Sequence, residues 1–427
     1  MENFDVVKIN VGYDSFDSNN LPIPNFFDLN LTPIVGLKSF TIDRLLDNTY
    51  ENFFPSTVDF FHSTNQTFIY PVLLYDSRLF DVETENLLSE KLVSSLKSGR
   101  GKIIFFYLTE GYFGTNEKDF FWINNLSEKY GIDKNQIVVV SANLDDDNRD
   151  IKKNFQTYKY PFWLNHITFF KSTNKLDMSS KKRFDDYKEF ISNNLTSDKK
   201  YHYLCFSSEP RIHRLIMYAE LMTNPIHEGK FIASLGSTYT DNENEFYLAI
   251  DNDVKLSNLK NYSIIRDYYK NYNSLSERTF DRLSLIHSKA AITGTINIRA
   301  HQDCFINIVT ETLSDLDNCV FFTEKTLKAI YSCQPFIIVG NYHTLKKLKD
   351  YGFKTFDKWW NEDYDDEKDF VKRMNKIINL LIDISKMEIN ECNNVLIEMN
   401  EILEHNFKTL CSTTELEKLY SFLNCND

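Results

Sequence analysis

One short segment of the sequence combines a hydroxyl, a carboxylate and a cation at a predicted helix start. Thr323, Glu324 and Lys325 follow the apolar residues 320–322 and open a stretch with helical spacing. Thr323 is suited to cap this helix, and the backbone N–H groups of a first turn attract anions. Lys325 and Lys328 place positive charge where the helix dipole disfavours it unless an anion is bound. The pattern predicts a site for a diphosphate and its ribose.

These side chains also have a purely structural interpretation. A carboxylate in a first turn interacts well with the helix dipole, and charged helix faces are usually only solvated. Taken alone, Glu324 and Lys325 would be a surface pair. The following residues 334–340 have the pattern of a buried strand that closes on Gly340, and this strand, helix and strand context favours the phosphate site.

Three basic residues follow a predicted strand at residues 201–206. Arg211, His213 and Arg214 come directly after it, and ligands of open α/β sheets bind outside the carboxyl ends of the strands. Alternatively, Arg214 pairs with a carboxylate such as Glu220, and His213 packs in the core. Arg211 is the preferred phosphate ligand of the three.

Two glutamates are also expected at strand ends. Glu311 follows the apolar residues 305–310, although a partner such as Arg299 would satisfy it equally well. In the first half of the chain, Glu110 follows the predicted strand 102–107 and is a candidate general base. Other carboxylates compete with Glu110 for this role: Asp119 and Asp145 to Asp147.

The sequence offers no strong metal or cofactor motif. Gly-rich phosphate loops, H-E-x-x-H, nucleophile elbows and EF-hand loops are all missing, and the seven cysteines form no C-x-x-C pair. Short Asp-x-Asp matches at residues 145–147 and 251–253 arise too often by chance to indicate a metal. We therefore expect a metal-free site and free thiols in a reducing compartment.

Charge and hydropathy restrict the partners. The net charge of −13 disfavours a broad nucleic-acid surface, which needs clustered Lys and Arg. Neither a secretory h-region nor an apolar run of about 18 residues occurs, so we expect a cytoplasmic protein without a membrane span. The oligomeric state stays open.

The 427 residues are too many for one ordinary core and predict two domains. In the first half, a helix over residues 85–96 precedes a strand, a helix and a strand: 102–107, 117–130 and 136–141. After a polar linker at residues 174–200, strands are expected at 201–206, 231–235 and 304–309. A helix at 342–351, a short strand at 353–356 and helices near 366–381, 395–403 and 416–423 close the chain. We predict an α/β protein with two Rossmann-like domains that face a cleft, residues 1–195 and 200–427.

Residues 305–340 resemble a known signature. The segments Phe305–Glu311, Phe322–Ala329 and Gln334–Gly340 look like the donor-binding signature of α1,3-fucosyltransferase-like glycosyltransferases. The turn at residues 208–214 and the segment 352–356 are similar to those of viral and bacterial glycosyltransferase-like proteins. Members of the family have the GT-B architecture of two Rossmann domains and bind a nucleotide-sugar.

The resemblance also implies residue roles. Arg211 and Lys325 would contact the diphosphate, Glu324 would hold ribose hydroxyls, and Glu311 would sit close to the transferred sugar. Thr312 stands where the family has Asn, so the resemblance does not fix fucose as the donor sugar.

These observations together favour a hexosyl- or fucosyl-type glycosyltransferase, inverting and metal-independent. It would move a sugar from a GDP- or UDP-linked donor to a hydroxyl of a glycan or another acceptor, and no further cofactor is expected. One alternative is a non-catalytic glycan- or nucleotide-binding protein with a transferase-like fold. Another is a transferase that acts on modified bases in DNA, which the acidic charge disfavours.

Overall fold

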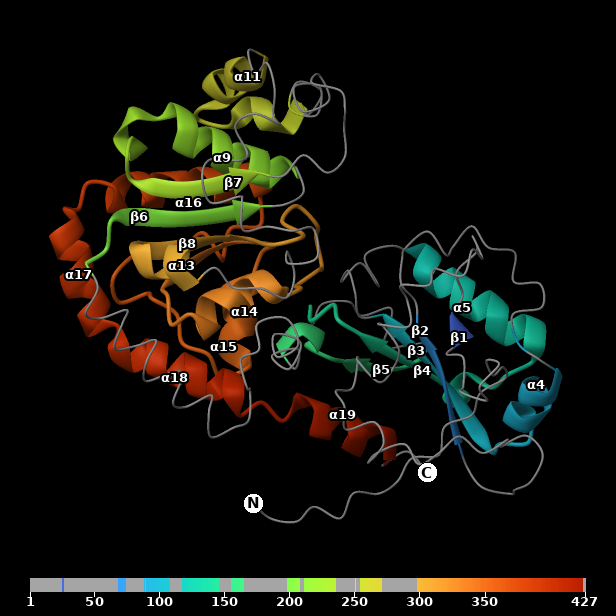
Figure 1. The fold of residues 1–427 in the computed structure, drawn as a ribbon. Helices are drawn as coiled ribbons and strands as arrows, with labels where there is room; N and C mark the ends of the chain where they lie inside the picture. The colour runs from blue at the N-terminus through green and yellow to red at the C-terminus, as the bar shows by residue number, and fades with distance from the viewer. Residues whose placement is uncertain are drawn as a thin grey trace, which may run out of the picture. The chain divides into compact units, whose positions relative to one another are not determined.

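The computed structural model describes the chain in eleven segments: residues 25–26, 68–73, 88, 90–107, 117–145, 155–164, 198–207, 211–235, 250, 254–270 and 298–424. The chain divides into two compact units. Unit 1 contains residues 1–166 and 414–427, and unit 2 contains residues 167–413. The last helix, α19 (Glu415–Asn424), therefore belongs to the same unit as the N-terminal residues (Figure 1).

The described part of unit 1 is a parallel sheet with helices. Its strands lie in the order β1-β2-β3-β4-β5, and every neighbouring pair is parallel. The strands are β1 (Asn25–Phe26), β2 (Phe68–Leu73), β3 (Gly101–Tyr107), β4 (Ile137–Ser141) and β5 (Gln156–Lys159). Helix α4 (Glu90–Lys97) precedes β3, and α5 (Glu117–Tyr130) connects β3 to β4.

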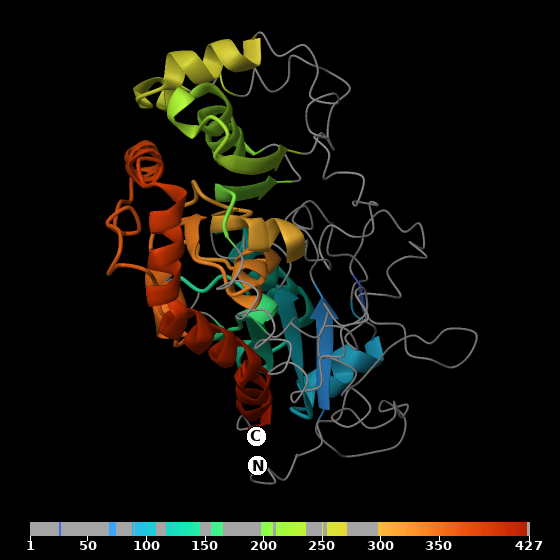
Figure 2. The ribbon, with the colours of Figure 1, turned by 60° about the vertical axis from the view of Figure 1, so that its left-hand side comes forward.

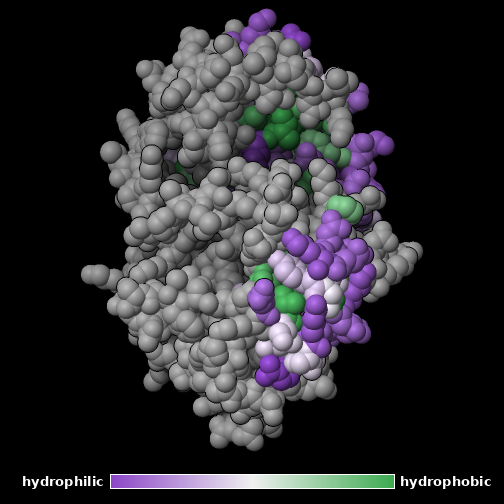
Figure 3. Space-filling view, turned by 90° about the vertical axis from the view of Figure 1, so that its right-hand side faces the viewer, coloured by the Kyte–Doolittle hydropathy of each residue, from purple (hydrophilic) through white to green (hydrophobic). Residues whose placement is uncertain are grey.

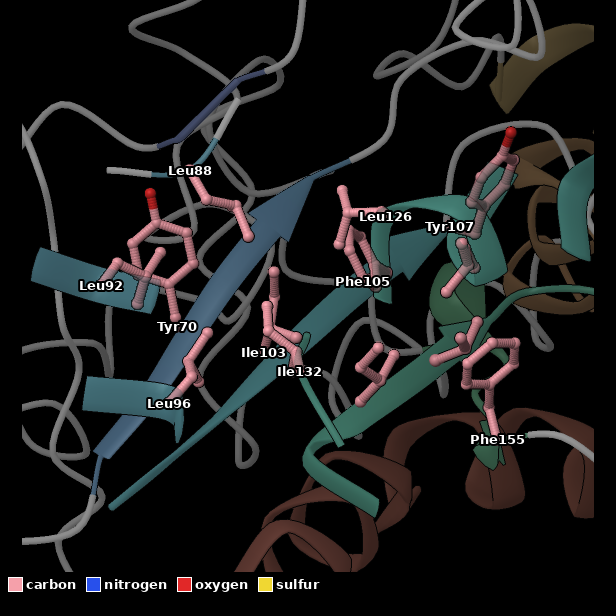
Figure 4. Close-up of a cluster of buried hydrophobic side chains, with 13 residues drawn as sticks. Tyr70, Leu88, Leu92, Leu96, Ile103, Phe105, Tyr107, Leu126, Ile132 and Phe155 are labelled. Atoms are coloured by element: carbon pink, nitrogen blue, oxygen red, sulfur yellow. The ribbon is translucent and has the colours of Figure 1, made fainter. Parts of the chain in front are cut away.

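The core of unit 1 forms because β3 alternates its side chains between two buried faces. Ile103, Phe105 and Tyr107 share one face and pack against helix residues such as Leu92 and Leu126 (Figure 4). Ile104 and Phe106 point to the opposite face and are also buried. A strand buried on both sides reads as a continuous apolar run, which is why the sequence identifies β3 so clearly. In Figure 3, most of the surface formed by described residues on the side of α4 and α5 is hydrophilic.

The described part of unit 2 contains a four-stranded parallel sheet in the order β7-β6-β8-β9. Its strands are β6 (Tyr201–Ser207), β7 (Phe231–Leu235), β8 (Cys304–Thr310) and β9 (Phe336–Val339). Helix α9 (Ile212–Thr223) leads from β6 to β7, and α14 (Glu324–Tyr331) leads from β8 to β9. The two connections run in opposite directions from the central pair, so the strand order reverses between β6 and β8.

The other described helices of unit 2 surround this sheet. They are α11 (Tyr262–Lys270), α13 (Ile298–Asp303), α15 (Thr344–Asp350), α16 (Phe370–Ile384), α17 (Ile389–Glu398) and α18 (Asn400–Cys411). Short 3₁₀ turns occupy Lys134–Gln136 in unit 1 and Pro225–His227 and Val254–Asn258 in unit 2. Figures 1 and 2 show α17 and α18 running along one side of unit 2. Helix α18 packs on α14, with the rings of Phe407 and Tyr331 5.6 Å apart.

The predicted mixed α/β class with parallel sheets is confirmed, and both units are compatible with a Rossmann-like arrangement. The helix 117–130 and the strand 231–235 have the predicted bounds. The predicted strand 353–356 is wrong. Its backbone groups bond to side chains instead of a neighbouring strand: Asn406 binds both the N–H and the carbonyl of Lys354, and Glu362 accepts from the Phe356 N–H. The pattern over 395–403 spans two helices that meet at Met399.

No helix in the described ranges is both long and apolar enough to cross a bilayer.

The amino edge of the unit 2 sheet contains a buried histidine that should make stability depend on pH. His301 donates from Nδ1 to Gln334 Oε1 at 2.7 Å, and Gln334 donates to the Cys304 carbonyl. Burial, together with the nearby charges of Lys328 and Lys199, lowers the pKa of His301 to about 4 despite this bond.

Below about pH 6.5 the unfolded chain then binds a proton that the folded chain does not, so stability falls as pH falls. In His301→Gln this contribution is lost. We expect the difference in unfolding free energy between wild type and variant to shrink by about 2 kcal/mol between pH 7 and about pH 5. Urea denaturation at both pH values measures it, and a constant difference would contradict the assignment.

Candidate functional site

The carboxyl edge of the unit 2 sheet contains the point where the strand order reverses, and this is where open α/β sheets bind ligands. The ends of β6 and β8 are joined there by a hydrogen bond of 2.8 Å between the hydroxyls of Ser207 and Thr310. Helix α9 begins at this same edge. Arg211, the residue immediately before the helix, donates to the Thr312 carbonyl at 3.0 Å. The starts of two helices therefore meet the ends of two central strands.

Glu311 connects these elements through its backbone. Its N–H donates to the Val339 carbonyl at 3.1 Å, which continues the pairing of β8 with β9. Its carbonyl accepts from His213 Nε2 at 2.7 Å and from the Arg214 guanidinium at 3.1 Å. Both donors belong to α9, so the first turn of α9 is held directly against the end of β8.

The side chain of Glu311 holds α14. The carboxylate accepts from the Thr323 N–H at 3.1 Å, the Thr323 hydroxyl at 2.5 Å and the Thr326 hydroxyl at 2.5 Å. Glu311 is 0% exposed. The sequence led us to expect this carboxylate near a transferred sugar. In the structure the carboxylate bonds to the start of α14, where it positions the neighbouring residues.

Helix α14 begins as predicted, but two of its amides are already occupied. Thr323 is the N-cap, and its hydroxyl oxygen accepts from the Lys325 N–H at 3.3 Å. The Thr323 N–H donates to Glu311. Two amides at this helix start are therefore occupied by protein groups. Positive charge at this helix start comes mainly from the Lys325 side chain.

Three charged side chains lie close together on α14. Lys325 Nζ is 2.9 Å from Glu324 Oε1, and these side chains are 18% and 10% exposed. Burial raises the pKa of Glu324, but the charges of Lys325 and Lys328 outweigh it and leave the pKa lowered. Burial lowers the pKa of Lys328 to about 8, although Glu324 opposes the shift. A further anion beside these lysines would reduce the cost of keeping them charged.

The start of α9 differs from that of α14. Arg211 is the N-cap residue and makes no side-chain cap bond. Burial and the charges of Arg214, Arg211 and Lys325 lower the pKa of His213 far below its ordinary value, against its bond to Glu311. His213 is therefore neutral, and cations from both helices lie around it.

The structure gives the remaining predicted residues different positions. His213 and Arg214 are buried and donate to a carbonyl at the end of β8. For His213 this agrees with the alternative prediction that it packs in the core. The guanidinium of Arg214 donates to the carbonyls of Thr310 and Glu311. Gly340 ends β9, where an added Cβ would lie 2.9 Å from Thr344 Oγ1. Glu110 lies outside the described residues.

Sequence reasoning missed Thr326, the second hydroxyl on the Glu311 carboxylate. A signal was present, because Thr323 and Thr326 are three residues apart and such pairs share one side of a helix. Ser207 was also missed, since one serine at the end of a strand is not distinctive.

Comparison with models of known protein families finds no match for this sequence, and comparison with curated proteins finds no significant relative. Among the described residues, no group of three or more His, Cys, Asp and Glu side chains is positioned to hold a metal ion. Function is therefore inferred from the motifs and from the geometry of unit 2.

The role of Glu311 can be tested by the isosteric change Glu311→Gln. The variant would place an amide group against the donors of Thr323 and Thr326, so we expect a loss of about 1–3 kcal/mol in stability. Thr326→Val removes one of the three donors and should cost about 1 kcal/mol. Chemical denaturation of both variants measures the order of the effects, and an unchanged stability of Glu311→Gln would contradict the positioning role.

Proposed function

We propose that unit 2 binds the diphosphate of a nucleotide-sugar at the reversal point between β6 and β8, and that the protein transfers the sugar to a hydroxyl acceptor. The observation that carries this proposal is the joint position of Arg211 and Lys325. They come from separate helices, yet both charges act on His213 at the carboxyl edge of one sheet. A dianionic ligand suits such a position, since it would offset the repulsion between the cations.

The side chains divide into ligand-binding and positioning groups. Arg211 and the first N–H groups of α9 bind one phosphate, and Lys325 with Lys328 binds the other. Glu324 accepts from ribose hydroxyls, in keeping with its lowered pKa and hence its ionised state. Glu311, His213, Arg214 and Thr323 keep the two helix starts at a fixed separation and do not need to touch the ligand.

The chemistry proposed is an inverting displacement at the anomeric carbon. A carboxylate, for which Glu110 remains the candidate, takes the proton of the acceptor hydroxyl. The cations stabilise the negative charge that develops on the departing diphosphate. A GT-B organisation, with one Rossmann-like domain for the donor and one for the acceptor, is part of this proposal.

One observation favours a second candidate, a nucleotide- or glycan-binding protein without turnover. The Glu311 carboxylate, which the family resemblance associates with the transferred sugar, is bonded to Thr323 and Thr326. Incubation with a panel of GDP-, UDP- and CDP-sugars separates the two candidates. Release of nucleoside diphosphate supports the transferase, whereas ligand binding without any release supports the binding protein.

Removal of either cation should weaken the binding of nucleoside diphosphates. Arg211→Ala and Lys325→Ala each delete a charged contact, so we expect the Kd for the preferred diphosphate to rise about tenfold to a hundredfold. Lys372→Ala, which removes an exposed lysine of α16, is the matched control and should leave Kd unchanged. Isothermal titration calorimetry gives the values, and the site is wrong if both site variants bind as the wild type does.

Glu324→Ala separates the ribose contact from the phosphate contact. We expect the Kd of the nucleoside diphosphate to rise about tenfold, while inorganic pyrophosphate, which has no ribose, binds no more weakly than before. Competition between the two ligands measures both affinities on one sample. An equal loss for both ligands would remove the ribose role and leave Glu324 as a partner of Lys325 only.

A further inference from the structure

A short loop connects the end of β9 to α15 at the carboxyl edge of the unit 2 sheet, and the proposed phosphate contacts do not use it. The loop contains Asn341, Tyr342 and His343. The rings of Tyr342 and His343 are stacked, with their centroids 3.6 Å apart and their planes 25° from parallel. Both residues are partly exposed. A pair of aromatic rings therefore lies at the edge where open α/β sheets bind ligands.

The backbone of this loop has a conformation that few residues other than glycine adopt. His343 has φ 64° and ψ 21°, in the left-handed region. Its N–H donates to the Asp365 carbonyl at 2.9 Å. The Thr344 hydroxyl donates to the Asn341 carbonyl at 2.6 Å, and Asn341 Oδ1 accepts from the Leu316 N–H at 3.0 Å. Strain of this kind persists only where surrounding contacts fix it, and it is concentrated at ligand-binding sites.

The loop lies beside the segment that leads from β8 into α14. One guanidinium, that of Arg373, donates to the carbonyls of Gly340 and Ser314, which belong to the two segments. Two residues before Ser314, the Thr312 carbonyl accepts from Arg211, the proposed phosphate ligand. Strands β8 and β9 are neighbours, and neighbouring strands lie about 4.8 Å apart. The stacked rings therefore follow the strand end next to the proposed diphosphate site.

A purely structural role does not account for this arrangement. His343 Nε2 lies 3.4 Å from Asp366 Oδ1, but this carboxylate side chain is 79% exposed, and surface contacts of this kind contribute little to stability. The left-handed backbone, in contrast, costs free energy. A loop that only connected β9 to α15 could have glycine at position 343, which adopts this conformation without a steric penalty. The sequence instead has a ring there, and this ring packs against Tyr342.

We infer that Tyr342 is the platform on which the base of the bound nucleotide stacks, with the His343 ring on the opposite face. The inference rests on the proposed function, because it adds a contact to the same diphosphate site. Nucleobases stack on aromatic side chains, and every base has a π face that can do so. The diphosphate then lies at the ends of β6 and β8, the ribose at Glu324 and the base at the end of β9. Stacking raises the affinity for any nucleoside diphosphate, so selection among bases requires other contacts.

Ligands with and without a base test this inference. Ribose 5-diphosphate contains the diphosphate and the ribose but no base, so it should bind Tyr342→Ala as tightly as it binds the wild type. For GDP and UDP, we expect Kd to rise about fivefold to a hundredfold in Tyr342→Ala, because one base–aromatic stack is lost. Tyr342→Phe retains the ring and should bind GDP and UDP as the wild type does. Isothermal titration calorimetry measures the affinity of each variant for all three ligands.

A matched control and a second variant complete the experiment. Tyr262→Ala removes another partly exposed tyrosine, at the start of α11, and should leave every Kd unchanged. If Tyr342→Ala does not fold, Tyr342→Leu, which keeps an apolar side chain without a ring, takes its place and should show the same loss.

The outcomes separate this inference from the proposed function. Equal affinity of the wild type and the Tyr342 variants for GDP and UDP would overturn the inference alone. A loss of ribose 5-diphosphate binding by the same factor would also overturn it, since the loop would then only position the phosphate ligands. A wild type that binds none of the three ligands would overturn the proposed function and the inference with it.

Discussion

The organisation of unit 2 depends on the hydrogen bonds that converge on Glu311. Its N–H extends the pairing of β8 with β9, its carbonyl receives two donors from α9, and its carboxylate receives three donors from α14. A buried carboxylate needs such donors, because without them the cost of removing its charge from water is large. The same requirement that stabilises Glu311 therefore brings two helix starts to one edge of the sheet.

Buried cations of unit 2 follow a related rule. The Arg214 guanidinium donates to the carbonyls at the end of β8, and Arg373 of α16 donates to the carbonyls of Gly340, Ser314 and residues 367–368. Strand ends and loops leave carbonyls without sheet partners, and a planar guanidinium can satisfy several of them at once. These arginines fix the loops around the carboxyl edge, whereas Arg211 and Lys325 remain partly exposed there.

The two polar regions of α9 differ in burial and therefore in what they can do. At its first turn, partly exposed cations lie at the sheet edge where ligands bind. Toward its last turn, Glu220 is enclosed by His227, Asn224 and Asn261, and its charge can interact only with the protein itself. One helix thus connects a partly exposed edge suited to an anionic ligand with a carboxylate whose hydrogen bonds are all made inside the protein.

Much of the fold could be read from the sequence. The apolar runs of β3 and β8 identify strands buried on both faces, and Thr323 identifies the start of α14, because these features depend on neighbours close in the chain. Residues 353–356 look like a strand, and only the packing of α18 beside them supplies Asn406 in place of a partner strand. The sequence likewise places Glu311 at the end of a strand, but which donors reach its carboxylate depends on residues brought together by the sheet order. Local pattern determines elements and their ends, while tertiary structure decides whether a charged group faces a ligand or the protein, because desolvation and hydrogen bonding depend on contacts distant in sequence.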